Sequence, residues 1–173
     1  MPISISPEPV ECPGVVELFA AADAYGLSIY PPENYHALDA SEFARDGVTL
    51  LVARMDDGDA VGMAALVEVR EPDGETFGEL KRMFVHGAAR GTGVGRALLD
   101  TVETLARDRG IRTLRLETGE PQADALRLYE RAGFVRIPPF GEYVTDPTSI
   151  CMEKVLTPPA PTRASRSPQP RPR

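Results

Sequence analysis

Apolar residues along the chain cluster in short runs that polar turns separate, and this pattern predicts a strand-rich centre. Val48–Met55 and Ala60–Val69 are joined by Asp56-Asp57-Gly58-Asp59, a turn typical of a β-hairpin. The polar segment Glu71–Thr76 leads into a further strand-like run. The predicted strands are Val48–Met55, Ala60–Val69, Gly78–Val85, Thr113–Glu117, Phe134–Ile137 and Ser149–Val155, with Ile3–Ser6 as an additional candidate.

Other segments carry apolar residues at helical spacing. Val94, Leu98 and Val102, for example, lie on one face of a helix because they recur about every 3.6 residues. The predicted helices are residues 12–25, 40–45, 93–109 and 122–132. Glycine commonly follows the last turn of a helix, and three glycines are predicted to end the longer ones. These are Gly26, Gly110 and Gly133.

The order of these elements predicts the architecture. Strands joined by short turns pair antiparallel, whereas the turn after residues 93–109 is so short that this helix must be a crossover between parallel strands. The order ααβββαβαββ, with the candidate first strand before it, predicts an α/β fold. It has one mixed sheet with helices on both faces.

The composition indicates one folded domain followed by a tail. Of the 173 residues, 42% are hydrophobic and 26% are charged, which is typical of a soluble globular chain. Residues 158–173 are rich in proline and arginine, with four arginines and no acidic residue. We therefore expect a domain at residues 1–157 and a disordered tail at residues 158–173.

Charge and cysteine content narrow the function classes. The net charge is −7, and removing the four arginines of the tail leaves −11 on residues 1–157, which argues against nucleic-acid binding. No apolar run reaches the roughly 18 residues of a membrane span, and the N-terminus shows no secretion signal. Cys12 and Cys151 lack metal-ligand spacing. We expect a cytoplasmic protein with no metal, nucleic-acid or membrane partner.

The stretch Leu80–Ala97 carries the strongest chemical signal. It has the pattern of a strand, a glycine-rich loop and the start of a helix, so Gly91, Gly93 and Gly95 lie where helix N–H groups bind phosphate. A P-loop requires Lys-Ser or Lys-Thr at the end of such a loop, but Arg-Ala stands there. A Rossmann fingerprint requires G-x-G-x-x-G, whereas these glycines follow G-x-G-x-G.

The pattern that fits is R-x-x-G-x-G, formed by Arg90, Gly93 and Gly95, and here the sequence resembles the GNAT family of acetyl-CoA-dependent N-acetyltransferases. The family's later motif is matched by the residues from Leu128 to Phe134, L-Y-E-R-A-G-F. Three further segments resemble a bacterial, small-molecule-type subgroup: Pro31–Leu38, Leu116–Gly119 and Pro139–Lys154. The resemblance implies the GNAT fold, with two parallel strands that splay apart at the coenzyme A site.

The resemblance also implies acetyl-CoA as co-substrate and no metal. The backbone N–H of Met83 or Phe84 would polarise the thioester carbonyl, on a strand edge that includes Val85 and pairs with the pantetheine arm. Gln122 would form a hydrogen bond with the same arm. The pyrophosphate would lie against Arg90, Gly91, Thr92, Gly93, Val94, Gly95 and Arg96.

Acetyl transfer to an amine requires a base, because an alkyl ammonium group has a pKa of about 10.4, and a proton donor for the departing thiolate. By resemblance, Tyr129 aligns with the tyrosine that many GNAT enzymes direct at the coenzyme A sulfur. Glu79 and Glu117 both match places where family members keep a general base. We expect Glu79 to act through a water molecule, with Glu117 as the other candidate.

The acceptor is expected to bind at the variable loops. Tyr30, His36, Phe140 and Tyr143 are the candidate substrate residues, and Glu33 or Glu142 is a candidate for holding a cation. We therefore predict an N-acetyltransferase acting on the primary amine of a small molecule or amino-acid-like acceptor. The alternative is a catalytically silent acyl-CoA-binding sensor or scaffold. The sequence leaves a homodimer open.

Overall fold

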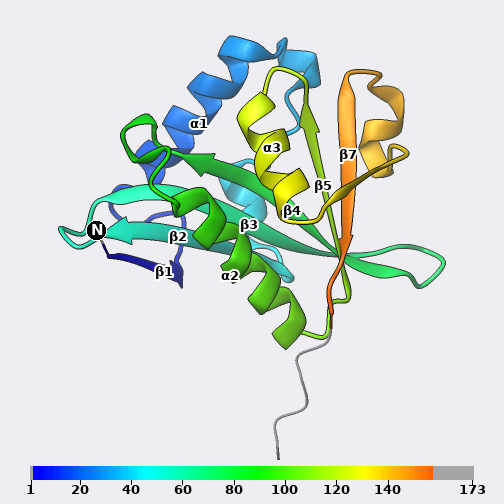
Figure 1. The fold of residues 1–173 in the computed structure, drawn as a ribbon, viewed down its shortest axis with the longest axis horizontal. Coiled ribbons are helices and arrows are strands. Elements are labelled where there is room, and N and C mark those ends of the chain that lie inside the picture. Colours follow the sequence, from blue (N-terminus) through cyan, green and yellow to red (C-terminus); the bar gives the residue numbers. More distant parts are fainter. Residues whose placement is uncertain (1, 158–173) are drawn as a thin grey trace, which may run out of the picture.

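A twisted seven-stranded sheet forms the centre of the molecule in a computed structural model that describes residues 2–157 (Figure 1). The strand order is β1-β2-β3-β4-β5-β7-β6. The strands are β1 (Ile3–Pro7), β2 (Val48–Met55), β3 (Ala60–Arg70), β4 (Thr76–Val85), β5 (Thr113–Gly119), β6 (Val135–Ile137) and β7 (Ser149–Val155). All neighbouring pairs are antiparallel except β4 and β5, which are parallel and joined by the crossover helix α2 (Val94–Asp108). The predicted mixed sheet is confirmed.

Helices cover both faces of the sheet because the side chains of a strand alternate between faces. Leu51 of β2 packs in a core with α2 and α3, whereas its neighbours Leu50 and Val52 pack in a second core with α1. The α-helices are α1 (Val15–Ile29), α2 (Val94–Asp108) and α3 (Ala123–Arg131). Short 3₁₀ helices are η1 (Pro32–Asn34), η2 (Ala40–Ala44), η3 (Gly87–Ala89) and η4 (Gly141–Thr145).

The end of the first helix was predicted wrongly. We expected Gly26 to terminate it, but α1 continues to Ile29 and Gly26 lies inside it. The reason is packing: a Cβ atom on Gly26 would lie 2.2 Å from Cε2 of the Tyr35 ring. Glycine is therefore required here by a close side-chain contact rather than by a helix end. The helix expected at residues 40–45 is a 3₁₀ helix, η2.

A bulge in β4 prepares the sheet for a ligand. Arg82 and Met83 lie opposite Ala64 of β3, two residues against one, and Arg82 has a left-handed φ of 56°. That conformation costs a residue with a side chain about 1–2 kcal/mol. Compensation comes from the guanidinium group, which pairs with Asp23 of α1 at 2.5 Å and stacks over the Phe19 ring at 4.3 Å. Helix α1 is thereby tied to the bulge.

Strands β4 and β5 separate just before the bulge. Their pairing consists of Gly78–Leu80 against Leu114–Leu116, and it ends there. We call the resulting gap the splay; it confirms the expected parting of two parallel strands. Because the pairing stops at Leu80 and Leu116, the first residues at its mouth are Lys81 and Glu117.

Two further predictions from the sequence concern membrane-spanning helices and the C-terminal tail. No helix within residues 2–157 is long and apolar enough to cross a membrane. The tail expected at residues 158–173 lies outside the described residues, so its predicted disorder stays a prediction.

Candidate active site

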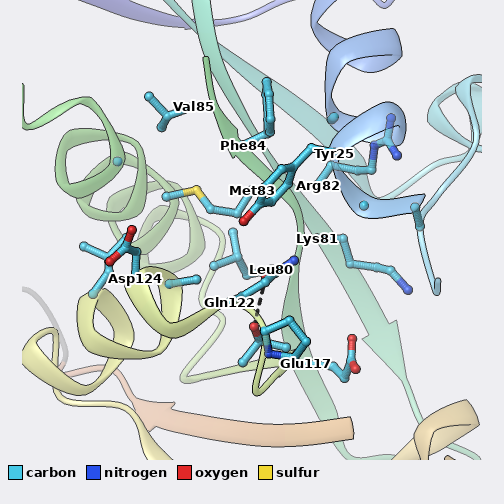
Figure 2. Close-up of a pocket in the computed structure, with 18 of the residues that line it drawn as sticks. Tyr25, Leu80, Lys81, Arg82, Met83, Phe84, Val85, Glu117, Gln122 and Asp124 are labelled. Atoms are coloured by element: carbon cyan, nitrogen blue, oxygen red, sulfur yellow. Dashed lines mark hydrogen bonds between the residues drawn. The ribbon is translucent and has the colours of Figure 1, made fainter. Parts of the chain in front are cut away.

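A cavity of about 590 Å³ opens in the splay, between α1 on one side and α2 and α3 on the other (Figure 2). Val85, Phe84 and Met83 follow one another along the β4 wall, and Glu117 lies toward the opposite end in this view. A cavity of this volume is within the range of small-molecule sites. Its two ends differ in chemistry: one is bordered by the glycine-rich loop and the other by ionisable and aromatic side chains.

The β4 wall offers a free backbone edge. Met83, Phe84 and Val85 all line the cavity, and they lie beyond the last residue of β4 that pairs with β5. Unpaired N–H and C=O groups on a strand edge can bind an extended ligand as another strand would. The three residues expected to hold a pantetheine arm therefore lie together on an edge that β5 leaves unpaired, where the Val85 carbonyl accepts a hydrogen bond from Arg90 Nε.

The glycine-rich loop leads directly into α2. Gly91 and Gly93 have left-handed φ values of 78° and 93°, and a Cβ on either would meet no atom within 4 Å. Glycine is therefore required at both positions by the backbone conformation and not by crowding within the described chain. Gly93 caps α2, so the unpaired N–H groups of the first helical turn point back toward the loop. This arrangement suits an anionic phosphate group.

Two arginines flank this loop in different ways. The Arg90 guanidinium lines the cavity, donates from Nε to the Val85 carbonyl at 3.1 Å and lies 4.9 Å from the centroid of the Tyr25 ring. Arg96 instead pairs with Asp100 one turn along α2 at 2.9 Å and lies outside the cavity lining. Thr92 donates to the Ala89 carbonyl at 2.6 Å, a contact that fixes the loop.

The turn between β5 and α3 forms the facing wall. Thr118 donates from Oγ1 to the Gln122 side-chain oxygen at 3.0 Å, and this contact is drawn as a dashed line in Figure 2. Gln122 lines the cavity, and its side-chain amide nitrogen is a hydrogen-bond donor. It was predicted as a pantetheine contact, and it faces the β4 edge across the splay.

The two candidate bases occupy different positions. Glu117 lines the cavity and accepts a hydrogen bond from Ser149 Oγ at 2.7 Å, while burial raises the pKa of its carboxyl group. Glu79 is 9% exposed and lies outside the lining, behind Tyr143, whose hydroxyl donates to it at 2.5 Å. Burial raises the pKa of Glu79 too, and the Lys81 ammonium, 3.8 Å away, opposes that shift.

Tyr129 projects from α3 into the cavity lining, although its side chain is 5% exposed. Burial raises the pKa of its hydroxyl, and the nearby Glu117 carboxylate raises it further. The phenol therefore stays protonated across the physiological range. A protonated hydroxyl beside a bound thioester has the proton that a thiolate leaving group requires.

The predicted acceptor residues are only partly brought together. Tyr30, His36 and Tyr143 line the cavity, but Phe140 lies outside it and packs edge-on against Tyr143 and Phe77. Glu33 and Glu142, expected to hold a cation, are exposed and also lie outside the lining. Glu142 instead pairs with Lys81 at 3.3 Å.

Sequence reasoning missed Lys81, Tyr25 and Asp146. Lys81 donates to the Tyr143 hydroxyl at 2.8 Å, and Asp146 accepts from His36; both contacts join residues distant in the chain. No local spacing of residues in the sequence predicts such long-range pairs. Tyr25 could have been found, because it lies on the same face of α1 as the buried Leu18 and Ala22. Within residues 2–157 no cluster of three metal-ligating side chains is present.

Comparisons with known proteins agree on one family. The sequence model of the Acetyltransferase (GNAT) family matches residues 15–134. An IAA acetyltransferase from Azospirillum brasilense is 43% identical over 82% of this chain and 90% of that relative. A solved protein from Klebsiella pneumoniae, assigned to the acyl-CoA N-acyltransferases, is 34% identical with a TM-score of 0.72, covering 90% of this chain and 98% of its own. The PaiA N-acetyltransferase of Thermoplasma acidophilum, solved with coenzyme A, shares the fold at 20% identity, with a TM-score of 0.68 over 90% of this chain and 99% of its own.

Proposed function

Because this chain belongs to the GNAT acetyltransferase family, we propose that it transfers the acetyl group of acetyl-CoA to the primary amine of a small molecule. The observation that carries this proposal is a single cavity that runs from the N-terminus of α2, along the free edge of β4, to a carboxylate at the mouth of the splay. A small acceptor is supported by the name of the Azospirillum relative.

The coenzyme would be held mostly by backbone groups. The N–H groups of the loop and of the first turn of α2 would take the pyrophosphate, with Arg90 adding a fixed positive charge. The pantetheine arm would lie along Met83, Phe84 and Val85 and face Gln122. In this orientation the thioester carbonyl would accept from the Met83 or Phe84 N–H, which stabilises the negative charge that develops on its oxygen during attack.

Glu117 is the base that the geometry supports better. Its carboxylate lines the cavity, and its raised pKa moves it toward the amine's, which improves proton transfer. The neutral amine nitrogen attacks the thioester carbonyl carbon, the C–S bond breaks, and the proton lost by nitrogen passes through a water to Glu117. Tyr129 gives its proton to the departing sulfur. Glu79, which we preferred from the sequence, would instead hold the Tyr143 hydroxyl in place.

The first test is binding. Coenzyme A at about 100 times its dissociation constant should stabilise the chain by about 2.7 kcal/mol. For a domain of this size, that corresponds to a rise in melting temperature of roughly 5–10 °C. Calorimetry without heat, together with an unchanged melting temperature, would contradict the proposal.

The second test is turnover. Thiol release from acetyl-CoA, measured against a panel of primary amines, should show acceptor-dependent activity that Glu117→Gln lowers about 100-fold. The matched variant Glu79→Gln should lose less, since Glu79 lies behind the cavity wall. Binding of coenzyme A without turnover of any amine would instead favour the silent sensor or scaffold.

A further inference from the structure

The net reaction leaves one proton unassigned. An acceptor that arrives as an ammonium ion, R–NH₃⁺, ends as the amide R–NH–CO–CH₃, so two protons leave its nitrogen. One of them ends on the coenzyme A sulfur, and the other must reach solvent as H⁺. The proposed roles of Glu117 and Tyr129 account for the proton that is lost during attack and the one that sulfur receives. They provide no group that first converts the ammonium into a nucleophile.

His36 is a second ionisable group in the wall near Glu117. It lines the cavity, and its Nε2 atom lies 3.0 Å from Asp146 Oδ2. Its ring also packs edge-on against the Tyr143 ring, with centroids 5.4 Å apart. Two side chains therefore fix the position of the imidazole, one through a polar contact and one through an aromatic contact.

Asp146 is itself held by several donors. It accepts from Asn34 Nδ2 at 2.8 Å, from the Thr148 backbone N–H at 2.9 Å and from Thr148 Oγ1 at 2.6 Å. These hydrogen bonds, with the one from His36, keep the pKa of Asp146 well below its ordinary value. Because the carboxylate stays ionised, it favours the tautomer in which Nε2 carries the hydrogen. The other nitrogen, Nδ1, then keeps its lone pair and can accept a proton.

The charged groups around this imidazole are consistent with proton exchange. Asp146 contacts the ring directly, and Glu117 and Lys81 are further charged groups nearby. The side chain of His36 is 19% exposed, so a proton that it receives can pass to solvent. An imidazole has two ring nitrogens, so one can keep its hydrogen bond with a carboxylate while the other accepts a proton.

We propose that His36 Nδ1 removes the first proton from the ammonium form of the acceptor and releases it to solvent, with Asp146 as the positioning residue behind it. The N–H bond of the ammonium breaks, its electron pair stays on nitrogen, and the proton forms an N–H bond with Nδ1. The imidazolium so formed is stabilised by the Asp146 carboxylate and then loses the proton to water. This role rests on the proposed acetyltransferase function and adds a second proton acceptor to the same site.

The test compares two amines over a range of pH. The variant His36→Gln should lower kcat/KM about 10–100-fold at pH 7 for a simple alkylamine. This loss should shrink steadily toward the amine's pKa of about 10.4, because the neutral amine then enters from solution. For an amino-acid amide, whose α-amino group has a pKa of about 8, the loss should be smaller and should vanish near that pH. Asp146→Asn should show the same pattern with a smaller loss.

Controls separate this role from a structural one. His86 is exposed and belongs to a different segment, so His86→Gln should keep the wild-type pH profile. Coenzyme A affinity should be unchanged in His36→Gln and Asp146→Asn. Asp146→Asn should lower the melting temperature, because the ionised carboxylate accepts hydrogen bonds from Asn34, Thr148 and His36, so its kinetics are measured at a temperature where the variant stays folded. An equal loss at every pH and for both amines, or no loss in either variant, would overturn the proposal while leaving acetyl transfer intact. Wild-type protein that binds coenzyme A but acetylates no amine would overturn both proposals.

Discussion

At the scale of single residues, the site depends on groups that burial has shifted away from their ordinary titration. Tyr129 and Glu117 share one cavity, and burial raises the pKa of both groups, while the Glu117 carboxylate raises the pKa of the Tyr129 hydroxyl further. In the proposed mechanism, these shifts give the two groups different tasks. The phenol remains a proton donor at every physiological pH, while the carboxylate becomes a stronger base than an exposed glutamate.

Tyr129→Phe tests the proton donor. Removing one oxygen keeps the ring that packs against Phe134 at a centroid distance of 5.9 Å, so the fold should be preserved. We expect kcat to fall about 10²-fold or more with the affinity for acetyl-CoA nearly unchanged, because the proton is needed only as the C–S bond breaks. Steady-state kinetics and calorimetry measure the two quantities. Wild-type turnover in this variant would remove Tyr129 from the mechanism.

How far the sequence predicts these residues depends on how local their signal is. The glycine-rich loop was predictable because the left-handed φ of Gly91 and Gly93 is a property of their own backbone. The choice between Glu79 and Glu117 was not, because it depends on Tyr143 covering Glu79 from a loop far along the chain. The contact of His36 with Asp146 was not predictable for the same reason, because the two residues are far apart in the chain.

At the scale of elements, the junction between the loop and α2 combines a strained turn with a binding surface. Gly93→Ala should affect both properties. A Cβ there meets no other described atom, so the cost is the left-handed backbone, about 1–2 kcal/mol of stability. The same substitution should also weaken coenzyme A binding, since the first N–H groups of α2 shift with the cap.

Gly58→Ala is the matched control for this prediction. Gly58 has a φ of 91°, close to the 93° of Gly93, and a Cβ there also meets no atom within 4 Å, but it lies in the β2–β3 turn. Both variants should lose similar stability in denaturant titrations, and only Gly93→Ala should lose coenzyme A affinity. Equal affinity in the two variants would contradict a role for the cap in binding.

Element boundaries show where local signals fail. The order and type of the main helices and strands followed from periodicity, because each buries one face against the sheet. The end of α1 did not, since Gly26 makes room for the Tyr35 ring. The bulge at Arg82 has no local sequence pattern either, because its strain is relieved by Asp23 and Phe19 of another element, and only the family resemblance implied a bulge on this strand.

At the scale of the whole molecule, the buried Glu117 carboxylate lowers the free energy of unfolding. Burial raises the folded-state pKa of Glu117 above its unfolded value, so the folded state binds its proton more tightly. Stability linked to this group is therefore fully present below the unfolded pKa and is lost as pH rises through the folded pKa. Each unit of such a shift corresponds to about 1.4 kcal/mol. An ionised Glu117 is thus a cost that the fold bears at neutral pH.

Glu117→Gln should remove that cost along with activity. The melting temperature of the variant should match the wild type in acid, exceed it increasingly as pH rises through the folded pKa of Glu117, and then stay at a constant difference. The exposed Glu130 on α3 provides the control, since Glu130→Gln should leave the pH dependence unchanged. Thermal unfolding scans at a series of pH values decide the matter. A variant less stable than wild type at neutral pH would refute this account.

The brief pairing of β4 with β5 has a mechanical consequence. Only three residues of each strand join the β1–β4 half of the sheet to the β5, β7 and β6 half. A cofactor bound between the two halves would contact both of them. Its binding should therefore reduce the motion of one half relative to the other. Amide hydrogens of β5 and of the bulged end of β4 would then exchange more slowly with solvent, even where they touch no ligand atom. The bound cofactor would thereby bridge β4 and β5 where the two strands do not pair with each other.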